Sequence, residues 1–175
     1  MRSLLFSIIV ATGLFAATSA FSPGPKPLND ATIVAIFDAA NTYDIETGEL
    51  ALQKAKTTAV RDLAQQFVND HRAVRQQGRD LAKKLSVTPT APAQFDLAEA
   101  HAKAMAELRS KSGAEFDQAY AAHEVAFHQA VLDAVASTLL PAIKNGELKA
   151  FVEKVGPHFL GHLEAARQLQ KKLTA

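Results

Sequence analysis

Apolar residues recur at intervals of three and four along most of the chain after residue 29, and no segment alternates with period two over a strand's length. Glycine and proline gather in short stretches between these segments. The pattern predicts an all-α chain with four long amphipathic helices and one shorter helix, over about residues 30–56, 58–85, 112–140 and 147–173, and 95–109. Short links within each pair of long helices, with the shorter helix in a longer middle connection, are typical of a ferritin-like four-helix bundle with one crossover.

Residues that favour helix starts precede three of the long segments. They are Asn29 or Asp30, Thr57 or Thr58, and Ser112, which forms a capping box with Glu115. Within the last segment, Pro157 predicts a kink or a short break, because proline lacks the N–H that a helix interior needs.

The first twenty residues have the composition of a secretory signal peptide. Arg2 is followed by an apolar run over residues 4–17 and by small residues up to Ala20, where we expect cleavage. This run is shorter than the roughly 20 residues of a membrane span. We therefore expect a signal peptide over residues 1–20, a linker over 21–29, and a helical domain over 30–175 that lies in the periplasm or is secreted and has no transmembrane span.

Composition excludes several classes of function. The chain has no cysteine, which rules out disulfides, thiolate metal sites and a cysteine nucleophile. Its 19 basic and 18 acidic residues leave a net charge near zero, so no basic field for nucleic acid is expected. No phosphate-binding glycine loop, nucleophile elbow or H-E-x-x-H helix occurs, and we predict no nucleotide or organic cofactor.

Each long segment carries one ionisable residue within its apolar stripe: Asp44, His71, His128 and His162. In an antiparallel helix pair, residues equidistant from the connecting turn lie at the same height, because each residue rises about 1.5 Å. Reflection through the two short turns matches His71 with Asp44 and His128 with His162. The four side chains should therefore share one layer near the middle of the bundle.

Further polar residues lie close to this layer. Glu124 precedes His128 by one helical turn, so the two side chains can converge on one ligand. His158 stands in the same relation to His162, and Glu46 follows Asp44 off the apolar stripe. Asp70 is rotated by roughly 100° from His71 and should point away from the layer. The predicted metal ligands are Asp44, His71, Glu124, His128 and His162, with Glu46 and His158 as a second set.

Imidazole nitrogens and carboxylate oxygens together suit zinc, iron, copper or manganese. The usual di-metal bundle has a glutamate on two helices and Glu-x-x-His on the other two. This chain has Glu-x-x-x-His at 124–128 and more histidines than carboxylates, which favours a mononuclear, histidine-rich site in a protein of metal handling or stress protection. Two alternatives remain open. One is a metal-free envelope-stress or protein-interaction module with structural histidines and a docking surface at residues 97–108; the other is an oxidase-like or peroxidase-like activity at the same layer.

Several short motifs occur in a fixed order along the mature chain. They are Asn41-x-x-Asp44-Ile45-x-x-Gly48-x-Leu50-Ala51, Asp70-His71, Phe116-Asp117-x-x-Tyr120, Glu124-x-x-x-His128, Leu148-Lys149 and Pro157-x-x-x-x-His162-Leu163. In this series the chain resembles a bacterial family of exported, ferritin-like helical proteins of unknown function, often labelled outer-membrane proteins. The resemblance implies a four-helix bundle and an envelope location, without a settled activity. At position 44 that family usually has Glu, whereas this chain has the shorter Asp44. Asp44 could be a ligand itself, Glu46 could take its place as the ligand, or Asp44 could support another ligand.

Overall fold

A computed structural model describes residues 28–92 and 96–175, so the predicted signal peptide and nearly all of the linker lie outside the described residues. Within these two ranges the regular secondary structure is entirely helical, as predicted. The helices are α1 (Asp30–Lys54), α2 (Thr58–Lys84), α3 (Leu97–Ser110), α4 (Gly113–Ala134), the π-helical turn η1 (Val135–Leu139), α5 (Leu140–Ala142) and α6 (Gly146–Thr174).

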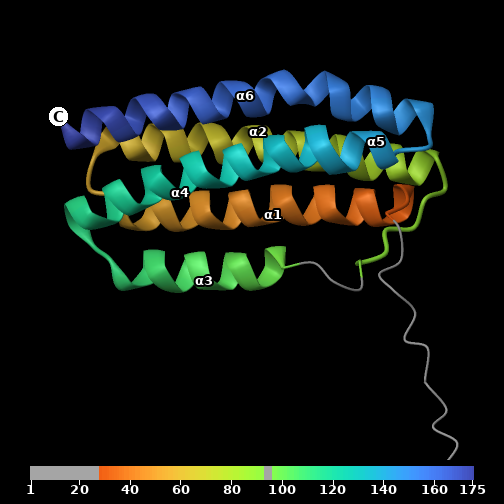
Figure 1. The fold of residues 1–175 in the computed structure, drawn as a ribbon. Coiled ribbons are helices and arrows are strands. Elements are labelled where there is room, and N and C mark those ends of the chain that lie inside the picture. Colours follow the sequence, from red (N-terminus) through yellow and green to blue (C-terminus); the bar gives the residue numbers. More distant parts are fainter. Residues whose placement is uncertain (1–27, 93–95) are drawn as a thin grey trace, which may run out of the picture.

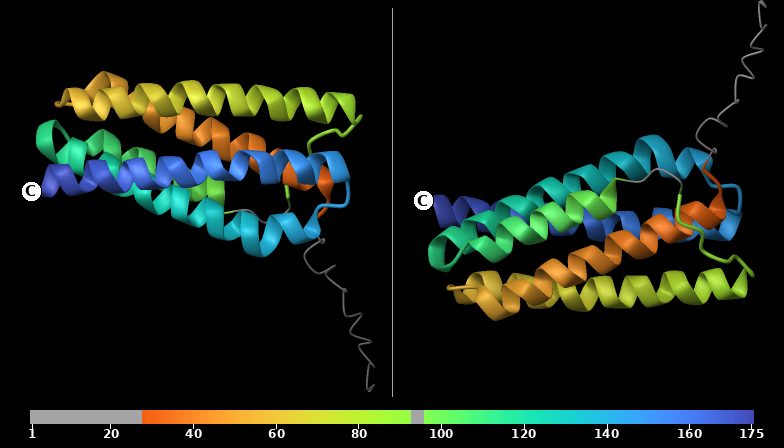
Figure 2. Two further views of the ribbon diagram at one scale, coloured as in Figure 1. Left: turned by 90° about the horizontal axis from the view of Figure 1, so that it is seen from above. Right: turned by 90° about the horizontal axis from the view of Figure 1, so that it is seen from below.

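Four long helical segments run side by side, while α3 lies outside them against α1 and α4 (Figures 1 and 2). Helix α2 returns antiparallel along α1, and α6 returns antiparallel along α4 with its continuation through η1 and α5 (Figure 1). The connection through α3 carries the chain back to the end of the bundle where α2 began, so that α4 runs in the same direction as α2 (Figure 1).

The two tight turns of the bundle are each held by an aspartate from the opposite helix pair. Asp117 on α4 accepts hydrogen bonds of 2.8 Å from the backbone N–H groups of Lys56 and Thr57, in the turn between α1 and α2. Asp30 on α1 accepts bonds of 2.8 and 2.9 Å from the N–H groups of Lys144 and Asn145, before α6. These carboxylates satisfy backbone donors that helix starts leave without partners.

The expected helix starts were right at Asn29 and Thr57, whose side chains accept from the third helical N–H. Ser112 is the N-terminal cap of α4, but its side chain makes no capping hydrogen bond, so the predicted capping box with Glu115 is wrong. The backbone enters α4 instead through Gly113 at a φ of 59°, a left-handed conformation that glycine adopts without strain.

The predicted helix over residues 112–140 is interrupted by η1, in which Leu140 N–H donates to Val135 O. Pro141 follows directly, and a proline cannot donate to the preceding turn and crowds its carbonyl. A wider π turn before the proline accommodates both effects. Pro157 has a smaller consequence, because α6 continues through it without the predicted break.

Two apolar clusters fill the ends of the bundle and leave the polar layer between them. One joins the start of α1 to the start of α6, around Ile33 and Val152. The other joins the end of α1 to the start of α4, around Ala51 and Phe116. Among the described residues, the stretch Gly113–Ala142 is long and apolar enough to cross a membrane by length and composition alone, which is weak support for a span. The same stretch carries Glu124, which is buried inside the bundle.

Candidate metal centre

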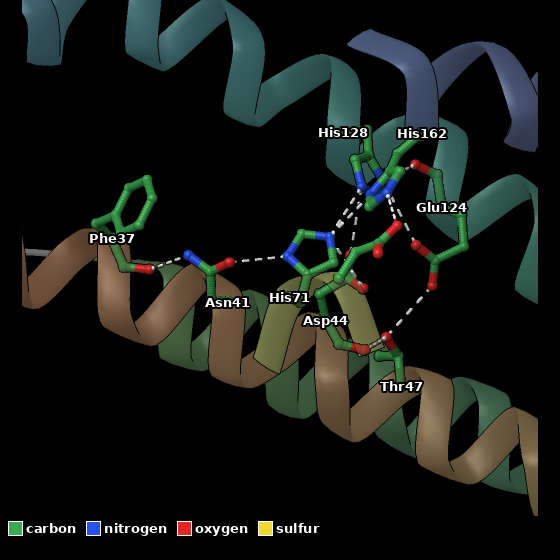
Figure 3. A network of polar contacts seen from close by, with 9 residues as sticks. Phe37, Asn41, Asp44, Thr47, His71, Glu124, His128 and His162 are labelled. Carbon is green, nitrogen blue, oxygen red and sulfur yellow. Dashed lines mark hydrogen bonds and ion pairs between the residues drawn. The ribbon is translucent and has the colours of Figure 1, made fainter. Parts of the chain in front are cut away.

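The predicted layer forms at the middle of the bundle, with contributors from all four long helices (Figure 3). All five residues of the first predicted set are buried, with Asp44 on α1, His71 on α2, Glu124 and His128 on α4, and His162 on α6. Each lies in the inward stripe of its helix. Three-and-four spacing therefore brings the residues to one height, and the aspartate-held turns keep the two helix pairs in register.

Each of the three histidines has one ring nitrogen committed to a hydrogen bond outside the centre. His71 Nδ1 lies 2.9 Å from Asn41 Oδ1, and His128 Nδ1 lies 3.0 Å from the backbone oxygen of Glu124. His162 Nε2 lies 3.0 Å from Asp70 Oδ2. Since all three partners are acceptors, each imidazole donates its N–H outward, and these contacts assign the ring protons.

The other ring nitrogen of each histidine points into the centre. His71 Nε2 lies 3.4 Å from His128 Nε2 and 3.2 Å from His162 Nδ1 (Figure 3). With the ring protons on the outer nitrogens, these contacts bring three lone pairs together with no ring N–H between them. A cation placed among them would turn that repulsion into coordination, which is how neutral imidazole binds metals.

Asp44 extends the same centre by an oxygen. Its Oδ1 lies 3.4 Å from His71 Nε2, and its Oδ2 lies 3.6 Å from His128 Nε2. For metal–nitrogen distances of about 2.0–2.1 Å, a tetrahedral site separates its ligand atoms by about 3.3–3.4 Å. The separations around His71 Nε2 match this spacing, and Asp44 places one oxygen beside His71 and the other beside His128.

Several buried oxygens at the centre have no hydrogen-bond partner among the described residues. They are both carboxylate oxygens of Asp44, Glu124 Oε2 and the hydroxyl of Tyr120. Buried polar atoms in native proteins are nearly always paired, so unpaired ones require an explanation. Glu124 Oε1 lies 3.3 Å from the Thr47 hydroxyl, which leaves Oε2 directed to the side of His128.

Burial sets the charge state of the metal-free centre. It raises the pKa of Asp44 to about 8 and that of Glu124 well above its usual value, to which the nearby Asp44 carboxylate adds. It lowers the pKa of His128 to about 3 and that of His71 well below its usual value, with the neighbouring histidines adding to the shift at His71. The imidazoles are therefore neutral at pH 7, the form that binds metals.

The second predicted set does not join the centre. Glu46 is directed outward and pairs with His101 on α3 at 2.7 Å, so it does not take the place of Asp44. His158 is exposed on α6, one turn from His162. Asp70 contradicts the prediction that it points away, because it contacts His162. A bundle helix faces two neighbours, and the side of α2 that carries Asp70 faces α6.

Three further residues complete the centre and were not singled out as site residues from sequence. Asn41 is fixed by a hydrogen bond from its Nδ2 to the Phe37 carbonyl, which turns its oxygen towards His71. Thr47 and Tyr120 border the carboxylate of Glu124. Asn41 lies three residues before Asp44, one turn away on the same helix face. This spacing could have identified Asn41 as a site residue from the sequence.

A cavity of about 570 Å³ reaches the centre between α1, α3 and α4. Its walls are mostly apolar, and Asn41, His71 and His128 lie among its lining residues. On the side of α2 and α6, a smaller cavity of about 150 Å³ reaches His71 and His162. The centre thus borders two openings of different polarity.

The family profile described as "Domain of unknown function (DUF4142)" matches residues 15–169. The chain belongs to this family. Among solved structures, "CopM in the Cu(II)-bound form" is similar, with a TM-score of 0.63 and 16% sequence identity over 83% of this chain and 98% of that chain. At this identity the likeness shows a shared fold alone. No curated protein matches the sequence. A helical family of unknown function agrees with the resemblance seen in the sequence.

Proposed function

We propose that this protein binds one transition-metal ion at the mid-bundle layer and serves in metal handling or in protection against metal stress. His71, His128 and His162 are the proposed nitrogen ligands, and Asp44 is the proposed oxygen ligand. Glu124 borders the site as a fifth group that can approach the ion or hold a proton beside it. The proposal includes export to the periplasm after loss of the signal peptide, and a ferritin-like classification of the bundle.

The observation that carries the proposal is the convergence of three unprotonated imidazole nitrogens beside a buried carboxyl group. The ligand atoms of His71, His128 and His162 lie within 4.8 Å of one another, and those of Asp44, Glu124 and His128 form a second such group. All of these residues are buried, and both oxygens of Asp44 have no hydrogen-bond partner among the described residues. A histidine cluster held by hydrogen bonds among its own members would place a ring N–H between neighbouring rings. Here the hydrogens are used outside the cluster, by Asn41, Asp70 and a backbone carbonyl. Outer partners of this kind are what orient metal-bound histidines.

A donor set of three nitrogens and one oxygen favours copper or zinc over manganese, which prefers oxygen ligands. Copper is the first ion to test, because a protein with the same fold is known in a Cu(II)-bound form. Zinc and iron are the comparison ions.

The test is metal analysis of protein purified without an affinity tag, together with titration of metal-depleted protein with Cu(II), Zn(II) and Fe(II). We expect one ion per chain and stabilisation by about 2.7 kcal/mol when free metal is 100 times the dissociation constant. The double variant His71→Ala, His128→Ala should lose both effects. His101→Ala is the matched control, since His101 pairs with Glu46 away from the centre. Wild-type protein without stoichiometric metal or metal-dependent stabilisation would refute the proposal.

The rival reading, a metal-free interaction module, calls for an apolar docking surface on the segment 97–108. In α3 the large apolar residues Met105 and Leu108 are buried, and Leu97 is half-buried. The one large hydrophobic residue that is exposed among those described is Leu160, on α6. The surface that this reading requires is therefore not found on α3.

A further inference from the structure

The cavity between α2 and α6 joins the surface of the protein to the centre. Its lining includes exposed His158 and half-exposed Asp70 at the outside and His71 at the inside. Among the three inner histidines, His162 is the most exposed, at 6% of its side chain against 2% for His71 and 1% for His128. His162 is therefore the most accessible of the three inner histidines, and it lies on this side.

His162 is the group that connects the two ends of this cavity. Its Nε2 faces outward to Asp70 at 3.0 Å, and its Nδ1 faces inward to His71 at 3.2 Å. The flat face of its ring stacks on Phe67, with centroids 4.2 Å apart and an interplanar angle of 25°. The stacked ring thus already presents one nitrogen to each side, Nε2 to Asp70 at the opening and Nδ1 to His71 at the centre.

We propose that Asp70 and His158 form a loading site through which the metal ion enters and leaves the buried centre, with His162 as the residue that passes it inward. This inference rests on the proposed metal-binding function. His158 lies one helical turn before His162, so its imidazole and the Asp70 carboxylate border the same opening. One nitrogen and one carboxylate oxygen are enough to hold a hydrated divalent ion briefly, while the buried centre offers four donors.

The apolar cavity on the other side does not offer such a route. It is bordered by α1, α3 and α4, and its lining carries the exposed Asp96 and Thr138 as polar groups. Apart from these two residues and Asn41, His71 and His128 at the centre, its lining is apolar. Moving a hydrated divalent ion past apolar side chains requires removing its water with nothing to replace it. At the opening beside Asp70, the carboxylate and imidazole groups of Asp70, His158 and His162 can replace the water molecules of the ion one after another.

The charge at the opening also bears on loading. Lys154 lines the same cavity as Asp70 and His158. Its ammonium group repels an approaching cation, whereas the Asp70 carboxylate attracts it. Electrostatic steering of this kind changes association rates by about 10-fold or more and weakens as salt is added.

The test is the rate of Cu(II) loading into metal-depleted protein, followed by stopped-flow quenching of tyrosine fluorescence. The chain has no tryptophan, and Tyr120 borders the centre, so its emission reports on filling. Release is measured by mixing the loaded protein with excess chelator. The variants are His158→Gln and Lys154→Gln, with Asp62→Asn, an exposed residue on α2 outside the cavity, as the control.

We expect His158→Gln to slow loading and release by the same factor, about 10-fold, because a residue that acts only along the route changes both rates together. Lys154→Gln should accelerate loading, most clearly at low salt, and Asp62→Asn should leave both rates as in the wild type. Asp70→Asn should slow loading and also weaken binding, since Asp70 orients His162.

Two results would overturn the loading site while leaving the proposed function intact. Wild-type rates in His158→Gln would mean that the ion takes another route. Faster release with unchanged loading would mean that His158 is a ligand of the final complex. Absence of Cu(II), Zn(II) and Fe(II) binding in the wild-type protein would instead refute the proposed function and this inference with it.

Discussion

Replacing Asn41 by leucine tests the assignment of the ring protons most directly. Asn41 Oδ1 accepts the Nδ1–H of His71, and Asn41 Nδ2 donates to the Phe37 carbonyl. Leucine has the same branching and the same number of side-chain heavy atoms, so the variant removes both hydrogen bonds, while its two methyl groups are bulkier than the amide and crowd the site. His71 would then keep its ring in place by packing alone, with no acceptor to hold the proton on Nδ1.

The expected losses of stability and of metal affinity follow from the burial of Asn41, which is 1% exposed. A buried donor or acceptor without a partner costs about 1–3 kcal/mol, so the metal-free variant should unfold at lower urea concentration than the wild type. Removing the outer partner of a metal-bound histidine weakens metal binding by about 10- to 100-fold. This corresponds to about 1.4–2.7 kcal/mol of binding free energy.

Two measurements separate these effects: urea unfolding of metal-depleted protein, and metal affinity by competition with a chelator of known strength. Asn41→Asp retains an acceptor for His71 and should keep wild-type affinity within a few-fold. Asn69→Ala, an exposed asparagine on α2 that bonds only Gln65, is the control for both. Wild-type metal affinity in Asn41→Leu, whatever its stability, would refute the assignment of His71 as a ligand through Nε2.

Three further outcomes are expected. Metal affinity should rise by about 10-fold per pH unit up to about pH 8 and then level off, because binding must displace the proton of Asp44, whose pKa burial raises to about 8; a flat profile in competition titrations would contradict this. Gly48→Ala should lower the free energy of unfolding by about 1–3 kcal/mol, since its Cβ would lie 2.6 Å from Val68 Cγ2. Gly78→Ala should leave stability unchanged, because its closest contact would be at 3.4 Å. Equal melting temperatures of the two variants would count against this packing. Asp117→Ala should destabilise the metal-free protein by at least about 1 kcal/mol in urea unfolding, because two backbone donors lose their acceptor, and an unchanged midpoint would show that water replaces it.

The helices and the height of the polar layer could be read from the sequence. Periodicity fixes which side of a helix is apolar, because each residue turns the helix by about 100°, and the rise per residue fixes depth. Asp44, His71, His128 and His162 were placed at one level by counting from the turns, and the structure puts them there. Local chemistry also sets the starts of α1 and α2 at Asn29 and Thr57.

Other features were decided by packing between helices. The sequence places Asp70 on a different face from His71, but in the bundle that face borders α6 and brings Asp70 to His162. Glu46 lies close to Asp44 along the chain yet pairs with His101, because α3 docks on that side of α1. Ser112 has the right spacing for a capping box and does not form one.

The positions of the ring protons show most clearly which features the sequence determines and which the tertiary structure decides. Sequence determined that three histidines and a carboxylate meet at mid-bundle, since composition and periodicity place them on inward faces. Tertiary structure alone decided that each imidazole gives its N–H to an acceptor outside the centre and turns its lone pair inward. The physical reason is that ring orientation depends on partners from other helices and from the preceding turn, whose positions are fixed only when the bundle is packed.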